Sequence, residues 1–454
     1  MSKHKRTIKN YQEAVSFLEA LSNISNIDRK SKKAAEERLE NFTRFLKFLG
    51  NPEKSPKIIH IAGTSGKGSV ATMLQNILIS AEKKTGVYTS PHTTTFCERI
   101  KVGDKYISEK DLADLTNFLK NKMDEYIYKL QTINYKLTLN FFEASFCLAL
   151  LYFQKQKCEY AVIETGMGGR YDATNAVKKP VYTIITNIGR DHLETIGPAL
   201  KDVAYEKAGI IKKGSPCLTG EKNQRWIKIF NAECRMQNAE CRITNYKNLK
   251  NIKTDLDGTE FEYKNEKYSL KLLGEHQASN AILAIECAND LKIGKQAIKK
   301  GLANTIYPAR LEVISKKPFI IIDGAHNEDK LKAAAEFLRQ NTHYATRYLI
   351  IAMARNKKVK ILPEFFRFFD KIYFTRFSNP FRKCFSLGDW QRILPKSEKK
   401  KMQYRHLAKD ALLDILLKLG NNDLLLVTGS IFLAGEVREY WHPANKIIKN
   451  RKSV

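Results

Sequence analysis

The sequence contains no run of about twenty apolar residues, the length that a membrane-spanning helix requires. Its first ten residues, MSKHKRTIKN, lack the apolar stretch of a secretory signal. The eight cysteines form no Cys-x-x-Cys pair and no regular framework. Internal repeats and long low-complexity linkers are also missing. We therefore expect a globular, cytoplasmic protein with reduced thiols and no membrane partner.

Acidic residues are scarce relative to basic ones. The sequence has 48 Asp and Glu against 78 Lys and Arg, which gives a net charge of +30. Such a surplus is typical of proteins that bind nucleic acids. Here the basic residues are spread along the chain and cluster only over short stretches such as 396–401 and 446–452. This distribution favours a solvated surface that attracts small polyanions such as ATP, and we expect no specific nucleic-acid partner.

The length of 454 residues exceeds the size at which one hydrophobic core normally stops growing. The pattern of short apolar runs and helical stretches restarts near residue 307. We therefore predict a larger first domain over residues 1–304 and a smaller second domain over residues 305–454.

Short β-rich runs alternate with stretches of helical spacing throughout the chain, which predicts α/β domains. Helices are expected in the first fifty residues and over 330–340 and 407–419. Strands are expected at 57–62, 160–164, 181–186, 319–323, 348–353, 371–377 and 424–428, with a hairpin over 259–272 that turns around 264–267. The first domain should be a P-loop-type, mostly parallel sheet with helices on both faces. The second should be a smaller Rossmann-like domain.

A glycine-rich loop separates the predicted strand 57–62 from a stretch of helical spacing. Its residues are Gly63, Thr64, Ser65, Gly66, Lys67, Gly68 and Ser69. Glycines allow backbone N–H groups to face a phosphate, and the following helix N-terminus adds positive potential. Lys67 would bring a full positive charge to the terminal phosphates, and Ser69 a hydroxyl to phosphate or metal. A plain turn after a strand would not need the lysine, so the loop predicts ATP binding.

The loop departs from the common P-loop pattern, because Ile61 replaces its first glycine and Gly68 separates the lysine from the serine. It resembles the GTNGKGS loop of the folylpolyglutamate and dihydrofolate synthases, members of the Mur ligase superfamily, with Ser65 in place of asparagine. The resemblance continues in the family's order over most of the chain. The further motifs are 89–92 (TSPH), 98–100 (ERI), 164–175 (ETGMGGRYDATN), 191–192 (DH), 206–211 (EKAGII), 274–281 (GEHQASNA), 308–312 (PARLE) and 323–327 (DGAHN).

This resemblance implies an ATP-dependent acid–amino-acid ligase of folate biosynthesis and one-carbon metabolism. Such an enzyme joins L-glutamate to a reduced folate, and the bifunctional members also join it to dihydropteroate. The family's route is an acyl phosphate, formed when the acceptor carboxylate attacks the γ-phosphate of ATP. The resemblance also implies a monomer.

The family resemblance assigns magnesium ligands to Ser90, Glu164 and His192. It further implies that Lys207 carries CO₂ as a carbamate and so becomes an oxygen ligand for a second Mg²⁺. Taken alone, His192 would more often be a structural histidine and Lys207 a helix-surface lysine. Only the surrounding motifs favour the catalytic interpretation.

In the second half of the chain, the resemblance places Gln277 and Asn280 near adenine and Arg310 on the phosphates. Asp323 and His326 are expected at the nucleotide and the reaction centre. Lys67, Lys207, Arg310 and His326 are thus the expected catalytic residues. A structural salt bridge is the alternative role for Arg310. Ala309 stands where the family usually has glycine.

Two residues are expected to bind the pterin of the acceptor. The resemblance to bacterial enzymes with both activities places Phe142 against the flat ring and Asp172 near its N–H groups. The alternative is that Phe141 and Phe142 simply open a buried helix. Bifunctional activity is our preferred interpretation.

Three other functions fit the sequence less well. A Mur-type ligase of cell-wall precursors shares the mechanism but lacks Gly68 and the His276-Gln277 motif in this form. A nucleic-acid-dependent P-loop ATPase would explain the charge but leaves His192 and Lys207 without a role. A catalytically inactive binding module is disfavoured because every expected catalytic side chain is present.

Overall fold

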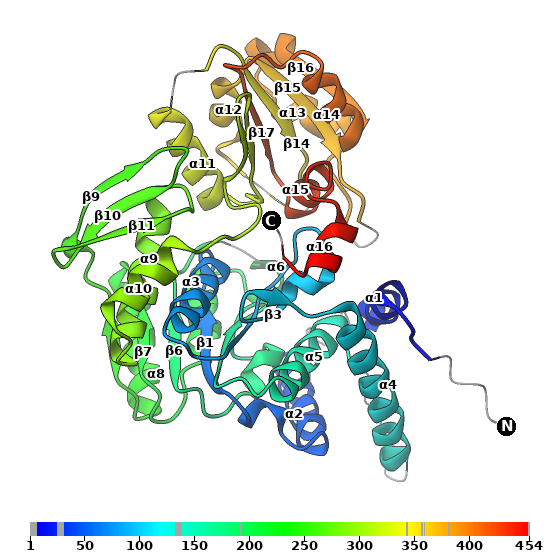
Figure 1. The fold of residues 1–454 in the computed structure, drawn as a ribbon, viewed down its shortest axis with the longest axis vertical. Coiled ribbons are helices and arrows are strands. Elements are labelled where there is room, and N and C mark those ends of the chain that lie inside the picture. The colour runs from blue at the N-terminus through cyan, green and yellow to red at the C-terminus, as the bar shows by residue number, and fades with distance from the viewer. Residues whose placement is uncertain are drawn as a thin grey trace. The chain divides into compact units, whose positions relative to one another are not determined.

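The computed structural model describes residues 7–24, 31–131, 139–190, 193–341, 344–355, 357, 359–379 and 382–452 (Figure 1). The chain forms two compact units. The first comprises Met1–Thr244, Leu283–Gly301 and Ile447–Lys452, and the second comprises Asn245–Ile282 and Leu302–Lys446. The chain therefore passes between the units several times, once near the boundary expected at residues 304 and 305. The division of the chain into two domains at that boundary remains a prediction.

An eight-stranded sheet forms the centre of the first unit, in the order β4-β3-β2-β5-β1-β6-β7-β8. The strands are β1 (Lys57–Ala62), β2 (Thr85–Tyr88), β3 (Ile100–Val102), β4 (Lys105–Tyr106), β5 (Tyr160–Glu164), β6 (Tyr182–Ile185), β7 (Cys217–Thr219) and β8 (Cys241–Ile243). Strands β2 and β5 to β8 run parallel to β1, whereas β3 and β4 form an antiparallel edge. The near-continuous apolar runs of β1 and β5 are typical of central parallel strands that are buried on both faces.

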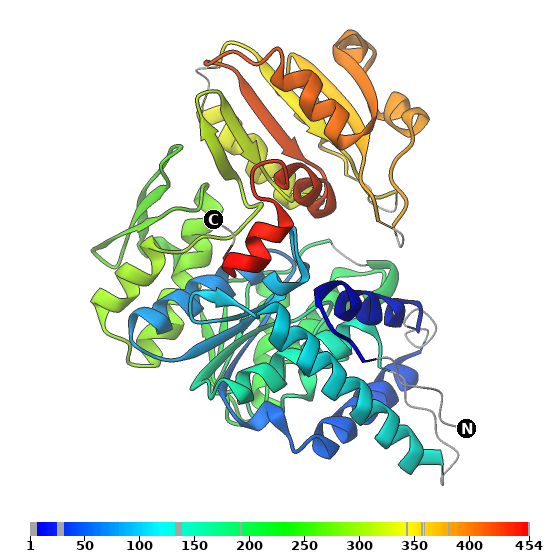
Figure 2. The same cartoon turned by 45° about the vertical axis from the view of Figure 1, so that its right-hand side comes forward.

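Helices lie on both faces of this sheet (Figure 2). They are α1 (Tyr11–Ala20), α2 (Lys32–Phe48), α3 (Lys67–Ser80), α4 (Glu109–Gln131), α5 (Phe141–Lys155), α6 (Leu193–Ile196), α7 (Leu200–Ala208), α8 (Gln224–Met236) and α10 (Lys295–Ala303), with the C-terminal part of α9 (Glu275–Asp290). Several begin at an N-cap residue whose side chain accepts a hydrogen bond from a backbone N–H of the first turn. Examples are Asn10, Ser31 and Asn140. None of the described helices is both long and apolar enough to cross a membrane.

A three-stranded antiparallel sheet opens the second unit. It consists of β9 (Leu249–Thr254), β10 (Thr259–Tyr263) and β11 (Glu266–Leu270), in the order β11-β10-β9. The expected hairpin is present, but its turn is only Lys264 and Asn265, both with positive φ, so β11 begins earlier than predicted. Strand β9 was not predicted, because its exposed lysines and asparagine give no clear apolar alternation.

The larger sheet of the second unit has six strands in the order β12-β13-β17-β14-β15-β16. These are β12 (Glu312–Lys316), β13 (Phe319–Ile322), β14 (Arg347–Ile351), β15 (Lys371–Arg376), β16 (Met402–Leu407) and β17 (Leu424–Thr428). All neighbours are parallel except the β12–β13 pair. The helices are α11 (Glu328–Gln340), α12 (Leu362–Phe365), α13 (Leu387–Ile393), α14 (Ala408–Leu416) and α15 (Ile431–Arg438), with the first residues of α16 (Ala444–Asn450), whose remainder from Ile447 belongs to the first unit.

The four strands predicted for this sheet are confirmed to within two residues at either end. The predicted helix 407–419 begins at Ala408 instead, because Leu407 still belongs to β16. Strand β16 lies at the edge of the sheet and is only partly buried. Because it mixes polar with apolar residues, it contains no continuous apolar run, and the sequence did not predict it.

Gly301 lies in α10 at a close approach to α3, the helix that follows the glycine-rich loop. A Cβ atom on Gly301 would lie 2.4 Å from Cα of Ile77, which is backbone and cannot rotate away. We expect Gly301→Ala to lower the free energy of unfolding by about 2 kcal/mol through overpacking. Chemical denaturation would measure this loss.

Gly294→Ala is the matched control. No atom lies within 4 Å of the Cβ position of Gly294, which precedes α10. This variant should change stability by less than about 1 kcal/mol. Equal losses in the two variants would contradict the close packing of α10 on α3.

Candidate active site

The glycine-rich loop lies between the buried strand β1 and helix α3, whose first turn is Lys67, Gly68 and Ser69. Gly63 begins the loop with a φ of 152°. A Cβ atom there would lie 1.7 Å from Oγ1 of Thr186, which follows β6, so only glycine fits. The carboxyl ends of β1 and β6 therefore meet at the start of the loop.

The segment after β6 holds the loop in shape. The N–H of Thr64 donates to the carbonyl of Asn187 over 3.0 Å, and the N–H of Ser65 donates to Oδ1 of Asn187 over 2.9 Å. Oγ1 of Thr186 donates to the carbonyl of Ser65 over 2.6 Å, and the N–H of Gly189 donates to Oγ1 of Thr64 over 2.9 Å. Asn187 is thus a site residue that the sequence motifs did not single out.

Glu221, just beyond β7, accepts backbone hydrogen bonds that hold this segment in place. One carboxylate oxygen accepts from the N–H of Ile188 over 2.7 Å, and the other accepts from the N–H of Asn223 over 2.8 Å. Glu221 is 7% exposed. No sequence motif pointed to Glu221, because its role depends on the neighbouring strand β6.

Two lysine side chains converge on the loop. Nζ of Lys67 donates to the carbonyl of Gly63 over 3.0 Å, and Nζ of Lys207 donates to the same carbonyl over 2.8 Å. Lys207 comes from α7 and is only 4% exposed. A helix-surface lysine is therefore excluded, and two positive charges lie where a phosphate would be bound.

Glu164 and Ser90 lie beside these lysines. Glu164 ends β5, is 4% exposed and lies 3.9 Å from Nζ of Lys67. The N–H of Ser90, beyond β2, donates to the Glu164 carboxylate over 3.0 Å. A buried carboxylate at the carboxyl edge of a parallel sheet is suited to hold Mg²⁺ near bound phosphates.

The predicted metal site stays a prediction. Its third ligand, His192, lies outside the described residues. Within the described part of the chain, no group of three or more His, Cys, Asp or Glu side chains could hold a metal ion. The expected ligand set, however, also draws on a serine, a modified lysine and His192.

Phe142 lies at the start of α5 and lines a small hollow in the first unit. The hollow is lined by Ala35, Arg38, Leu39, Asn140, Phe142, Glu143, Tyr171 and Ala173. The Phe142 ring also packs against Tyr88, with 5.9 Å between the ring centroids. Phe141 and Phe142 therefore do open a buried helix, but Phe142 keeps one side towards the hollow.

Asp172 lies between two residues that line the hollow but is itself only 1% exposed. Its carboxylate accepts from the N–H of Met167 over 2.9 Å and from the N–H and Oγ1 of Thr174 over 3.1 and 2.6 Å. Nε2 of His60 in turn lies 2.8 Å from Oγ1 of Thr174. Since burial lowers the pKa of His60 to about 3, the imidazole is neutral. Asp172 thus fixes the turn that carries Tyr171 and Ala173.

The site residues of the second unit fall into two groups. Gln277 and Asn280 lie one turn apart on α9, and Nδ2 of Asn280 donates to Oε1 of Gln277 over 3.1 Å. Arg310 stacks on the ring of Tyr307, 4.7 Å from its centroid. Arg310 occurs in none of the ion pairs among the described residues, whereas Glu312 pairs with the buried Arg438 over 2.8 Å.

Asp323 and His326 lie close to the Arg310 segment. The Asp323 carboxylate accepts from the N–H of Leu311 over 2.9 Å and from that of Ala325 over 2.8 Å, and burial raises its pKa. Nδ1 of His326 lies 2.8 Å from the carbonyl oxygen of Gly324. Because a carbonyl oxygen can only accept, Nδ1 carries the proton and donates it. Asp323 therefore ties β13 to the residue that follows Arg310.

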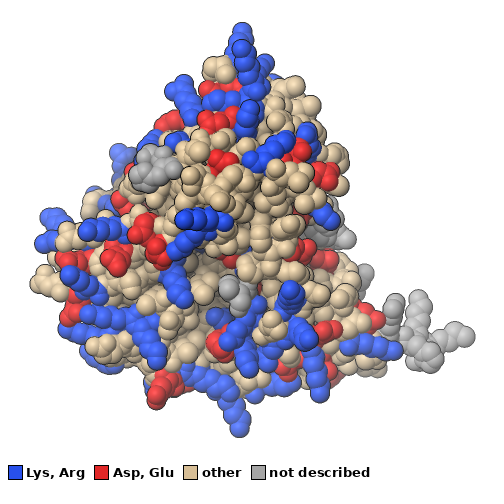
Figure 3. Space-filling view, turned by 45° about the horizontal axis from the view of Figure 1, so that its top comes forward, with Lys and Arg blue, Asp and Glu red and all other residues tan. Residues whose placement is uncertain are grey.

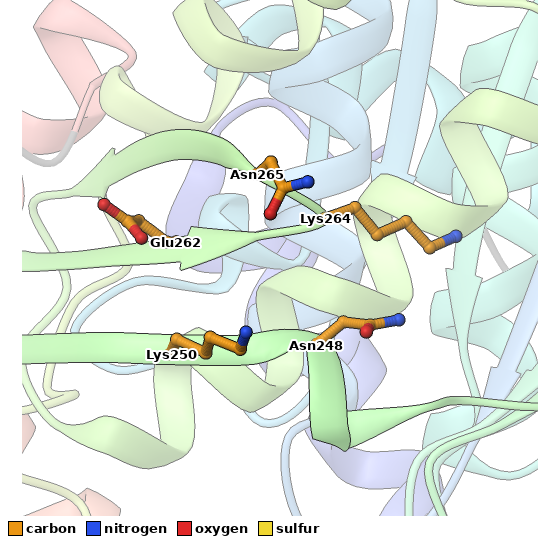
Figure 4. A pocket seen from close by; sticks show the side chains of 5 residues that line it. All are labelled: Asn248, Lys250, Glu262, Lys264 and Asn265. Carbon is orange, nitrogen blue, oxygen red and sulfur yellow. The ribbon is translucent and has the colours of Figure 1, made fainter.

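A separate hollow of about 240 Å³ lies on the three-stranded sheet (Figure 4). Asn248, Lys250, Glu262, Lys264 and Asn265 line it. None of the predicted site residues belongs to this set, so the hollow is not part of the candidate active site.

A phosphate-binding loop between a central parallel strand and a helix, with two lysines and a carboxylate beside it, defines a nucleotide-binding α/β enzyme of the P-loop type. The profile of the Mur ligase middle domain matches residues 61–288, and that of the dihydrofolate synthetase C-terminal domain matches residues 309–440. The dihydrofolate synthase/folylpolyglutamate synthase of Bacillus subtilis is 30% identical over 405 residues, which cover 86% of this chain and 92% of that protein. The chain therefore belongs to the folylpolyglutamate and dihydrofolate synthase family of Mur ligases.

Solved structures agree with this assignment. The folylpolyglutamate synthase of Mycobacterium tuberculosis, complexed with ADP and AMPPCP, has a TM-score of 0.79 at 26% identity and covers 89% of this chain and 95% of its own. The enzyme of Thermotoga maritima has a TM-score of 0.75 at 30% identity and covers 89% of this chain and 93% of its own. The α/β fold predicted from the sequence is thereby confirmed.

Asn187→Ala should weaken ATP binding, because the N–H of Ser65 loses its acceptor and the loop is no longer held for phosphate. Loss of one such hydrogen bond corresponds to about a tenfold rise in the dissociation constant. Calorimetric titration with AMPPCP would measure this rise. Asn223→Ala is the control, because that exposed side chain only caps α8. Unchanged affinity in Asn187→Ala would contradict the role of this residue.

Proposed function

We propose that this protein is an ATP-dependent ligase that joins L-glutamate to folate-type carboxylates, with both reduced folates and dihydropteroate as acceptors. The observation that carries the proposal is the convergence of Lys67 and Lys207 on the carbonyl of Gly63. The relatives named above carry the names of these two activities, and the mycobacterial structure holds ADP and an ATP analogue. Both findings support ATP as the nucleotide.

The chemistry requires a carboxylate to become an electrophile. An acceptor carboxylate oxygen attacks the γ-phosphorus of ATP, and the bond to the ADP oxygen breaks. The amine of glutamate then attacks the acyl carbon, and phosphate leaves as the amide forms. Because the first step brings two anions together, positive charge must lie at the transferring phosphoryl group. Lys67 is the side chain that can provide it directly.

Glu164, Ser90 and His192 would hold Mg²⁺, which supplies further positive charge to the phosphate oxygens. The buried Glu164 and its bond from the N–H of Ser90 support this assignment. We further propose that Lys207 carries CO₂ as a carbamate. The 4% exposure of Lys207 and its closeness to the loop support a role in the site rather than on the surface.

In the second unit, we assign adenine contacts to Gln277 and Asn280 and a phosphate contact to Arg310. Stacking on Tyr307 orients the Arg310 guanidinium, and the Asp323 carboxylate holds the adjoining Leu311. We further assign His326 to the reaction centre, where its Nδ1 donates to the Gly324 carbonyl and its Nε2 lies 3.4 Å from Nζ of Lys330.

The face of the molecule seen in Figure 3 does not favour a nucleic-acid partner. Figure 3 shows basic side chains scattered over the visible face, with acidic side chains between them. A nucleic-acid site usually gathers its basic residues in one patch or stripe. The scattered arrangement fits the small-molecule substrates proposed here, and a monomer remains our proposal for the quaternary state.

The test of the function is turnover with ATP, glutamate and either dihydropteroate or tetrahydrofolate, with the products identified by mass. We expect one glutamate to be added to each acceptor. Product from tetrahydrofolate alone would show that the second activity is absent. Product from neither acceptor would contradict the proposed function.

Lys67→Ala should abolish ligation while leaving the fold intact. Removal of a cationic contact to the transferring phosphoryl group is expected to lower kcat by about a thousandfold. Steady-state kinetics and circular dichroism would separate activity from folding. Lys213→Ala removes an exposed lysine and should leave kcat unchanged. Full activity in Lys67→Ala would remove the lysine from the mechanism.

Lys207→Ala should also inactivate the enzyme, and its rescue distinguishes two roles. If the working group is a carbamate, formate or acetate should partly restore turnover, because their oxygens replace the missing metal ligand. If the working group is the ammonium, methylamine should restore turnover instead. Rescue by methylamine alone would contradict the carbamate.

Phe142→Ala should raise the KM for dihydropteroate by about tenfold or more, because a ring that stacks on the pterin is lost. The KM for ATP should change less than about twofold, since the phosphate loop is untouched. Phe141→Ala is the matched control, because Phe141 packs on Phe96 and does not line the hollow. Asp172→Ala would not isolate a pterin contact, because it also removes the bonds that hold the turn.

A further inference from the structure

Three of the eight cysteines come together in one β-α-β unit. Cys217 begins β7, Cys234 lies in the last turn of α8, and Cys241 begins β8. The other described cysteines are Cys97, Cys147, Cys158, Cys287 and Cys384. The sequence shows no paired spacing for the three, so the fold alone creates the cluster.

The geometry of the cluster allows a disulfide. Cys217 and Cys241 are register partners on neighbouring parallel strands. Such partners lie about 4.8 Å apart with their side chains on the same face, and disulfides join Cα atoms about 4.4–6.8 Å apart. Cys234 is 2% exposed and belongs to the same apolar cluster as Cys217. Cys241 is partly buried and packs against this cluster.

The three thiols differ in acidity and in access. The neighbouring thiols of Cys217 and Cys234 lower the pKa of Cys241 to about 4, and Cys241 is partly exposed. The neighbouring thiols of Cys234 and Cys241, together with burial, raise the pKa of Cys217. An accessible thiolate next to protonated thiols is the arrangement of an oxidisable cysteine and its resolving partner.

We propose that Cys241 is an oxidation site for hydroperoxides and that Cys217 or Cys234 resolves it as a disulfide. The Cys241 sulfur attacks the O–O bond of the hydroperoxide, an S–O bond forms, and the leaving oxygen takes a proton to become an alcohol or water. The neighbouring thiol then attacks the sulfenic sulfur, and water leaves as the S–S bond forms. Two thiols thus lose two electrons and two protons to one hydroperoxide.

The position of the cluster links it to the active site. The apolar cluster that contains Cys217 and Cys234 also contains Ala204 and Ala208 of α7. Lys207 lies on the same helix, next to Ala208. A disulfide among these cysteines would therefore form in the apolar cluster that packs against α7, the helix that carries Lys207.

Cys384 provides an internal control. It is the other partly exposed cysteine among those described, and it lies in the second unit. Burial raises its pKa, and its sulfur lies 3.4 Å from the carbonyl of Phe377, with no thiol partner in the described part of the chain. Cys384 should therefore remain a free thiol under mild oxidation.

The test uses the full-length, reduced protein. Hydrogen peroxide is added at a small molar excess, free thiols are alkylated, and peptides are analysed by mass spectrometry. We expect a disulfide that contains Cys241 and either Cys217 or Cys234, reversible by dithiothreitol, while Cys384 remains alkylatable. Oxidation of Cys384 as fast as Cys241, a disulfide without Cys241, or conversion of Cys241 to sulfinic acid without a disulfide would overturn the proposal.

Two further measurements sharpen the test. Between pH 6 and 8, the alkylation rate of Cys241 should change less than about twofold, whereas that of Cys384 should rise about a hundredfold with its thiolate fraction. A hundredfold rise for Cys241 would argue against an accessible thiolate. Cys241→Ser should abolish the disulfide and Cys384→Ser should preserve it. The wild-type labelling decides the question even if a variant fails to fold.

Discussion

The close approach of Gly63 to Thr186 is the constraint on which the candidate active site depends. With no room for a Cβ atom, the chain after β1 lies directly against the segment after β6. Asn187 can then hold Thr64 and Ser65, and Glu221 can hold Ile188. The Gly63 carbonyl is left facing the ammonium groups of Lys67 and Lys207. One steric contact thus sets both the shape of the loop and the place where positive charge gathers.

The parallel sheet supplies the rigidity that this arrangement requires. Strands β1 and β5 are buried along almost their whole length, so their carboxyl ends are fixed by packing. Glu164 is the last residue of β5 and is in register with Ile61 of β1. A buried carboxylate beside two lysines is thereby held by backbone pairing rather than by a flexible side-chain network. Electrostatic stabilisation of a transferring phosphoryl group depends on such preorganisation.

Much of the central architecture could be predicted from the sequence, because buried parallel strands consist of continuous runs of apolar residues. The expected strands 57–62, 160–164 and 424–428 agree with β1, β5 and β17 at both ends. Strands β9 and β16 were not predicted, because they are partly exposed and mix polar with apolar residues.

The candidate active site could likewise be predicted only in part. Residues of the glycine loop, Glu164 and Lys207 were predicted from their motifs, and the structure brings them together. Asn187, Glu221 and the cysteine cluster could not be predicted, since each acts through a neighbour that only the fold supplies. Asp172 was predicted as a substrate contact, and its observed bonds hold a turn, a role that no spacing in the sequence reveals.

The most direct test of the central claim is the fate of the acceptor's carboxylate oxygen. Ligation would be run with an acceptor whose reacting carboxylate is labelled with oxygen-18, and the released phosphate would be analysed by mass spectrometry. An acyl phosphate formed at the Gly63 loop requires one labelled oxygen in each phosphate, with the other label retained in the amide. Unlabelled phosphate would contradict the account.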